Sequence, residues 1–204
     1  DTNNLPDCTH GDQIEFLRRI SNATFNYASV IHNAYDESED FNQYDAENNL
    51  DTQLSLVSRL IKGGLGSKIY MVSLGGFDTH GSQPEKHQKL LTTLSNSVKV
   101  FYDDLRYYGL DQKVLSLTFS EFGRRVQQNA SGGTDHGTAN NVFLIGGNLK
   151  KKGFYNAAAD LKKLEKGDLI YQMDFRKIYA TILEDWLEAS PTKILGKQFE
   201  KIII

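Results

Sequence analysis

Two carboxylates stand at matching places in this chain, each just after a short apolar run. Asp78 follows the run 69–74 and a Gly-Gly pair, and Glu121 follows the run 114–119. Ligands of an open α/β sheet bind beyond the carboxyl ends of its strands, so the repeated pattern predicts one shared site. His80 lies two residues after Asp78, close enough to share an ion if the turn is tight. Carboxylates and imidazoles together suit Zn, Mn, Mg or Ca, which predicts a divalent metal site.

A glycine-rich loop supplies a further pair of candidate ligands, Asp135 and His136. A histidine in such a loop is poorly placed for core packing, which favours a functional role for His136. Asp78 also has a purely structural interpretation, since an Asp after Gly-Gly can cap a helix beginning near Pro84 or close an Asx-turn. The remaining histidines are interpreted as surface or packing residues: His10, His32 and His87.

Two arginines, Arg124 and Arg125, follow Glu121 closely. A guanidinium matches phosphate or sulfate with two parallel hydrogen bonds, so this pair could clamp an anionic substrate. The same side chains could instead pair with Glu121 or Asp135 and have no further role. Both interpretations stay open at the level of sequence.

Composition limits what such a site could belong to. The 204 residues fit one domain, long enough to bury about 70% of the unfolded surface. A net charge of -3 and only one short basic run, 150–152, argue against a nucleic-acid-binding protein. Cys8 is the only cysteine, which excludes an internal disulfide and a cysteine-rich zinc site. No apolar stretch approaches the roughly 20 residues that span a bilayer.

Apolar periodicity and end signals predict four helical regions. These are one or two helices over 12–34, a helix from Leu50 or Asp51 to Gly63, one from Pro84 to Gly109, and one from Asp174 to Pro191. Between the first two lies 33–49, rich in Asn, Asp and Glu, which we interpret as a surface loop that can be mobile.

Strands are expected at 68–74, 114–119 and 141–145. The first two flank a long helix, so they are predicted to form a βαβ unit with parallel strands. The segment between the second and third shows no crossover helix, which favours an antiparallel third strand and brings His136 beside Asp78 and Glu121. The expected fold class is therefore α/β, with a mixed, mostly parallel sheet flanked by helices.

Four strings carry a resemblance to a known family. In order, they are GGFDTH (75–80), SEFGRR (120–125), GTDHGT (133–138) and DFR (174–176) through EDWL (184–187). With them the chain resembles the bacterial family called domain of unknown function 1501, which is grouped with the alkaline phosphatase and sulfatase superfamily. The resemblance runs from about residue 55 to near the end and implies, over 51–204, the carboxyl-terminal half of an alkaline-phosphatase-like fold. Residues 1–50 add little to it, and their apolar spacing predicts a helical amino-terminal segment with an Asn/Asp-rich loop.

The resemblance implies a metal-dependent hydrolase of phosphate or sulfate esters, acting on an anionic small molecule or glycan ester. Asp78, His80 and His136 look like the ligands of one metal, with Glu121 as a further ligand or general base and Arg124 orienting the anion. Phe122 stands where the superfamily has a metal-binding histidine. Family members are longer, with an export signal and a nucleophile upstream, so this chain is expected to be exported and to hold only part of a catalytic site. The alternative is a non-catalytic, envelope-associated binding module on the same fold.

Overall fold

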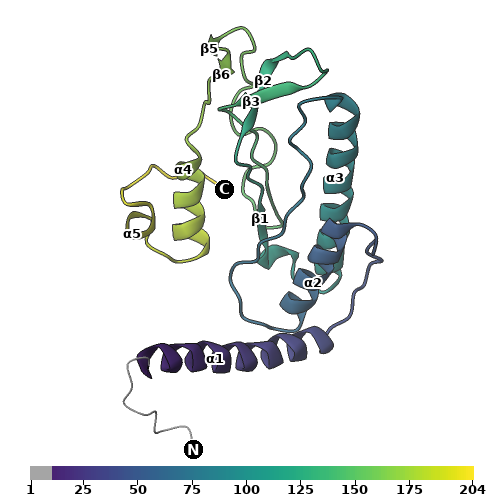
Figure 1. The fold of residues 1–204 in the computed structure, drawn as a ribbon, viewed down its shortest axis with the longest axis vertical. Helices are drawn as coiled ribbons and strands as arrows, with labels where there is room; N and C mark the ends of the chain where they lie inside the picture. Colours follow the sequence, from purple (N-terminus) through teal and green to yellow (C-terminus); the bar gives the residue numbers. More distant parts are fainter. Residues whose placement is uncertain (1–10) are drawn as a thin grey trace, which may run out of the picture.

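Helices make up most of the regular structure in residues 11–204, the part of the chain that the computed structural model describes (Figure 1). The helices are α1 (Gly11–Asp36), α2 (Asn49–Lys62), α3 (Gln83–Tyr107), α4 (Phe175–Thr181) and α5 (Pro191–Leu195), with a 3₁₀ turn at Asp111–Lys113 and a π-helical turn at Ile182–Trp186. The strands are β1 (Leu115–Leu117), β2 (Gly123–Gln128), β3 (Thr134–Gly137), β4 (Leu144–Gly146), β5 (Leu164–Glu165) and β6 (Asp168–Leu169). The predictions made for Cys8 and His10 lie outside the described residues.

Helices α2 and α3 pack together and hold the buried core, as their apolar stripes predict. The core cluster consists of Leu50, Leu54, Phe101, Tyr102 and Leu105. Asn48 caps the start of α2 by accepting a hydrogen bond from the Leu50 amide. Gly63 ends α2 where its backbone meets α1, because an added Cβ would lie 1.8 Å from the Ala34 carbonyl oxygen. The predicted end of α2 at Gly63 is confirmed.

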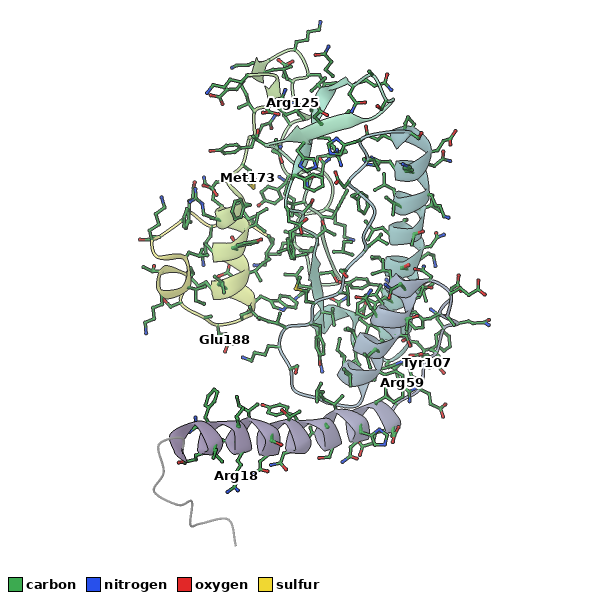
Figure 2. All side chains as sticks on the ribbon, in the orientation of Figure 1. Arg18, Arg59, Tyr107, Arg125, Met173 and Glu188 are labelled. Atoms are coloured by element: carbon green, nitrogen blue, oxygen red, sulfur yellow. The ribbon has the colours of Figure 1, made fainter. Side chains whose placement is uncertain are left out.

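Helix α1 is a single helix that touches the rest of the protein near its carboxyl-terminal end (Figure 1). At that junction the Arg59 guanidinium donates a 2.6 Å hydrogen bond to the Tyr35 carbonyl and lies over the Tyr35 ring. Figure 2 shows Arg59 at this junction and Arg18 toward the amino-terminal end of α1. No helix among residues 11–204 is both long and apolar enough to cross a membrane.

The acidic loop between α1 and α2 is anchored to α3. The Phe41 amide and the Tyr44 hydroxyl both donate hydrogen bonds of 3.0 Å to Asp104, which is fully buried on α3. The Phe41 ring also stacks on Tyr107, with centroids 3.6 Å apart. Burial and the nearby Asp104 charge both raise the pKa of Tyr44, so its hydroxyl stays protonated and donating.

The predicted mostly parallel, alkaline-phosphatase-like sheet is wrong. The described strands form three separate two-stranded antiparallel sheets, β1 with β4, β2 with β3, and β5 with β6. Residues 68–74, expected to be the first strand of a βαβ unit, run extended but form no backbone hydrogen bond with any other described segment. The backbone of Ser73 is bonded to a side chain instead: the Gln53 amide donates to the Ser73 carbonyl and accepts from the Ser73 N–H, while Val72 and Leu74 pack against the core. Without a paired neighbour there is no parallel ladder.

Two other expectations concern the end of the chain and the third strand. The antiparallel direction of the third strand is confirmed, since β4 pairs with β1 through Ser116 and Ile145. Asp174 caps α4 by accepting from the Arg176 amide, as predicted. Pro191 does not mark the end of that helix; it opens α5 at the first helical position, where its missing N–H costs nothing.

Candidate metal site

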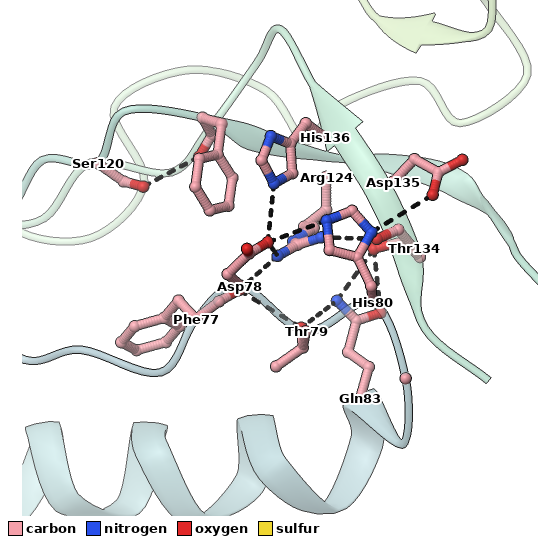
Figure 3. A network of polar contacts seen from close by, with 12 residues as sticks. Phe77, Asp78, Thr79, His80, Gln83, Ser120, Arg124, Thr134, Asp135 and His136 are labelled. Carbon is pink, nitrogen blue, oxygen red and sulfur yellow. Dashed lines mark hydrogen bonds and ion pairs between the residues drawn. The ribbon is translucent and has the colours of Figure 1, made fainter. Parts of the chain in front are cut away.

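Three predicted ligands come together at one end of α3, on the loop before it and on strand β3 (Figure 3). Asp78 Oδ1 lies 2.8 Å from His136 Nε2 and 3.0 Å from His80 Nε2. One ligand atom from each residue lies within 4.8 Å of the other two, and all three side chains are exposed to solvent. The structure thus assembles Asp78, His80 and His136, and their role as metal ligands stays a prediction.

The loop that carries Asp78 and His80 is held against the β2–β3 turn by close backbone contact. Ser82 has a left-handed backbone with φ of 50°, and its N–H donates to the Ser131 carbonyl. Gly133 approaches so closely that an added Cβ would lie 2.3 Å from the His80 carbonyl carbon. A side chain at this position would therefore push the two loops apart, which explains the need for glycine there.

Strand β3 presents His136 next to Phe122. The register pairs His136 with Arg124 of β2. The Phe122 ring stacks on the imidazole of His136, with centroids 3.8 Å apart and planes within 6° of parallel. Phe122 cannot bind a metal, but this contact fixes the plane of the imidazole that can.

The Arg124 guanidinium is hydrogen-bonded to other residues of the protein. Its guanidinium donates to the Thr134 carbonyl at 2.6 Å, the Phe77 carbonyl at 2.7 Å and the Asp78 carboxylate at 2.9 Å. With this geometry Arg124 positions the Asp78 loop. The sequence had left two roles open, clamping an anion or pairing with Glu121 or Asp135, and Asp78 was not among the expected partners. Arg125 points elsewhere, with its Nε 3.4 Å from Asp168 on β6.

The electrostatics of the cluster keep Asp78 ionised. Hydrogen bonds from His136 and Arg124 hold the pKa of the Asp78 carboxyl below its ordinary value. A carboxylate must be deprotonated to bind a metal, and with a lowered pKa Asp78 stays deprotonated to a lower pH than a free aspartate.

A supporting network beneath the loop has no counterpart in the sequence predictions. Thr79 is almost fully buried, and its hydroxyl lies 2.9 Å from His87 Nε2 and accepts from the Gln83 amide. Gln83 also donates to the Thr134 hydroxyl of β3. Burial and the Arg124 charge lower the pKa of His87, so it is neutral at pH 7. The spacing of Gln83 and His87, one turn apart on α3, is the sequence signal for this shared face.

The other predicted site residues lie nearby or elsewhere. Glu121 is exposed, is not a member of the three-residue cluster, and forms no hydrogen bond or ion pair among the described residues. Its role as base or further ligand stays a prediction. Asp135 Oδ1 lies 3.5 Å from the outer nitrogen of His80, Nδ1. His32 is on α1, where it pairs with Asp36 at 3.1 Å.

Comparison with known proteins identifies one matching family. A search of curated proteins and of solved structures finds no significant match. The family model described as "Protein of unknown function (DUF1501)" matches residues 27–187, a stretch that includes α2, α3, all six strands and every residue of the candidate site. The chain therefore belongs to the DUF1501 family.

Proposed function

We propose that Asp78, His80 and His136 bind one divalent transition-metal ion. The observation that carries this proposal is the convergence of two imidazole Nε2 atoms, 2.8 and 3.0 Å away, on one carboxylate oxygen. Two imidazoles with one carboxylate favour Zn or Mn over the harder ions Mg and Ca.

Two of the three ligand separations in the cluster are close to those around such an ion. Zn–N and Zn–O bonds of about 2.0–2.1 Å in a tetrahedron place neighbouring ligand atoms about 3.3 Å apart. The two N to O separations of 2.8 and 3.0 Å therefore need to widen by only a few tenths of an ångström, and the ligand atoms of the two histidines lie within 4.8 Å of each other. Three protein ligands would leave one coordination position open to water or substrate, an arrangement typical of catalytic rather than structural zinc.

From this arrangement and the family resemblance, we infer hydrolysis of an anionic ester, of phosphate or sulfate, as the reaction. When bound, such an ion would lower the pKa of its water molecule from the high value of bulk water toward about 7. Among the chain's own residues, Arg124 holds the Asp78 carboxylate and Phe122 sets the plane of His136. Glu121, exposed and with no hydrogen bond or ion pair among residues 11–204, would be available for proton transfer.

A metal titration tests the binding claim. Metal-free protein is titrated with Zn²⁺ and Mn²⁺ by calorimetry and by thermal unfolding, for the wild type and for Asp78→Ala and His136→Ala. At 100 times the dissociation constant the metal should stabilise the wild type by about 2.7 kcal/mol. His32→Ala is the matched control, because His32 also faces an aspartate at 3.1 Å but has no second histidine. Equal binding by the wild type and His136→Ala would overturn the proposal.

A second candidate function is a non-catalytic metal-binding module. Phe122 favours it, because an aromatic ring stands beside His136 where a second metal ligand would be needed for a two-metal site. Metal-loaded protein is assayed against aryl phosphates and aryl sulfates. Turnover that is lost in His136→Ala supports the hydrolase. Tight metal binding without turnover supports the binding module.

A further inference from the structure

His80 lies between two carboxylates, one at each ring nitrogen. Its Nε2 faces Asp78 Oδ1 at 3.0 Å, and its Nδ1 faces Asp135 Oδ1 at 3.5 Å (Figure 3). If Nε2 binds a metal ion, the proton of the neutral ring must sit on Nδ1, on the side of Asp135. The position of Asp135 therefore matters for how His80 presents its ligand atom.

The Asn129 side chain links Asp135 to the backbone of His80. The Asn129 amide nitrogen lies 3.1 Å from the His80 carbonyl oxygen and 3.4 Å from Asp135 Oδ1. The Asn129 side-chain oxygen accepts from the Ser131 and Gly133 amides, which fixes Asn129 in the β2–β3 turn. One amide thus links the His80 backbone and the Asp135 carboxylate to the same rigid turn.

His136 is oriented by an aromatic contact and not by a carboxylate at its Nδ1. Its ring stacks on Phe122, and no described carboxylate lies within ion-pair distance of its Nδ1. His80 has no such face-to-face partner, since its ring is tilted by 33° against His136 at a centroid distance of 4.9 Å. Asp135 is thus the described side chain placed to fix the rotation of the His80 ring.

We propose that Asp135 is a positioning residue for His80: in the metal-bound protein its carboxylate accepts a hydrogen bond from the Nδ1–H group, which now lies 3.5 Å away, so that Nε2 points at the ion held with Asp78 and His136. The inference rests on the proposed metal site and adds a residue to it. Removing a carboxylate that accepts from a metal-binding histidine typically costs 10- to 100-fold in metal affinity. The Asp135 side chain is 63% exposed, so the lower end, about tenfold, is expected.

The test compares Zn²⁺ dissociation constants, measured by competition with a chromophoric chelator, for wild type, Asp135→Ala and Asp135→Asn. Asp135→Ala should weaken binding about tenfold, and Asp135→Asn by less, because its amide oxygen still accepts. Glu37→Gln removes the same charge at an exposed position near the end of α1 and should stay within twofold of wild type. Long-range ¹H–¹⁵N spectra of the zinc-loaded protein should show the His80 Nδ1 proton in wild type, and its loss to solvent exchange in Asp135→Ala.

The outcomes separate this inference from the proposed function. If the wild type binds no Zn²⁺, the metal site fails and the role of Asp135 with it. If the wild type binds Zn²⁺ and Asp135→Ala binds within twofold as tightly, the metal site stands and the positioning role is overturned. A loss in Glu37→Gln as large as that in Asp135→Ala would also overturn it, because the loss of one negative charge would then explain the effect.

Discussion

Replacing Asp104 with Asn should destabilise the protein strongly, although the residue lies far from the candidate metal site. Asp104 is fully buried on α3 and accepts hydrogen bonds from Ser58, Tyr44 and the Phe41 amide. It also pairs with the ammonium of Lys62 at 2.9 Å, and the Lys62 side chain is only 3% exposed. The substitution keeps the shape of the side chain and removes the charge that Lys62 faces.

The size of the effect follows from leaving a buried cation without its main partner. Breaking one side of a buried ion pair costs about 3–5 kcal/mol. Lys62 keeps a weaker contact with Asp40 at 3.3 Å and a bond to the Glu39 carbonyl, so the lower end, about 3 kcal/mol, is expected. In a domain of this length that corresponds to a fall in melting temperature of roughly 6–12 °C.

The same pair predicts how stability depends on pH. Burial by itself raises the pKa of Asp104, but hydrogen bonds from Ser58, Lys62 and the Phe41 amide outweigh it and hold the pKa below its ordinary value. A carboxyl with a lowered pKa contributes stability above its unfolded pKa of about 3.9 and loses it as pH falls through the folded value. The difference in stability between wild type and Asp104→Asn should therefore be full at pH 7 and shrink below about pH 4.

Urea unfolding at pH 7 and pH 3 measures both effects. The matched control is Asp103→Asn, the neighbouring residue, whose ion pairs with Lys99 and Arg106 lie at the surface. Exposed pairs contribute about 0–1 kcal/mol, so the control should change little. A loss below 1 kcal/mol in Asp104→Asn, or an equal loss in both variants, would refute the reasoning.

Three further substitutions test other contacts of the fold by thermal and urea unfolding. Asp174→Ala removes the cap of α4 and should cost about 1 kcal/mol at pH 7. Hydrogen bonding to Arg176 lowers the pKa of Asp174 to about 2, so this loss should shrink as pH falls below about 4 and through about 2, and a pH-independent loss would contradict it. Gln53→Ala frees both backbone groups of Ser73 and should cost about 0.5–1 kcal/mol, whereas no change would show that solvent replaces the amide. Arg124→Lys keeps the charge but cannot reach three acceptors; it should cost about 1–2 kcal/mol, and unchanged stability would contradict its positioning role.

The helices of the core could be predicted from sequence because their signals are local. The apolar stripe of α3 and the Gly63 stop of α2 depend on residues within a few turns of one another. Sheet pairing depends on segments far apart in the sequence. The apolar run 69–74 is typical of a central strand. In the structure it lies extended, Ile69 and Met71 are largely exposed, and its backbone forms no hydrogen bond with another described backbone segment. Periodicity cannot reveal which neighbour a strand has.

The candidate site was predictable to the extent that motifs and glycine-rich loops reveal it. Asp78, His80 and His136 were identified from residue type and placement, and the structure brings them within reach of one ion. The hairpin that presents His136 was missed, because β2 has the polar sequence Gly123–Gln128 with no apolar alternation. The ion pair between Arg124 and Asp78 depends on this hairpin. The partner of Arg124 therefore could not be chosen from the sequence alone.

Anomalous diffraction from crystals soaked in Zn²⁺ tests the central claim most directly. The account predicts one peak with bonds of about 2.0–2.2 Å to an Asp78 carboxylate oxygen and to Nε2 of both His80 and His136. The His80 ring should then turn its Nδ1 toward Asp135. A zinc-soaked crystal with no peak at these three side chains, or with a peak that they do not ligate, would contradict the account.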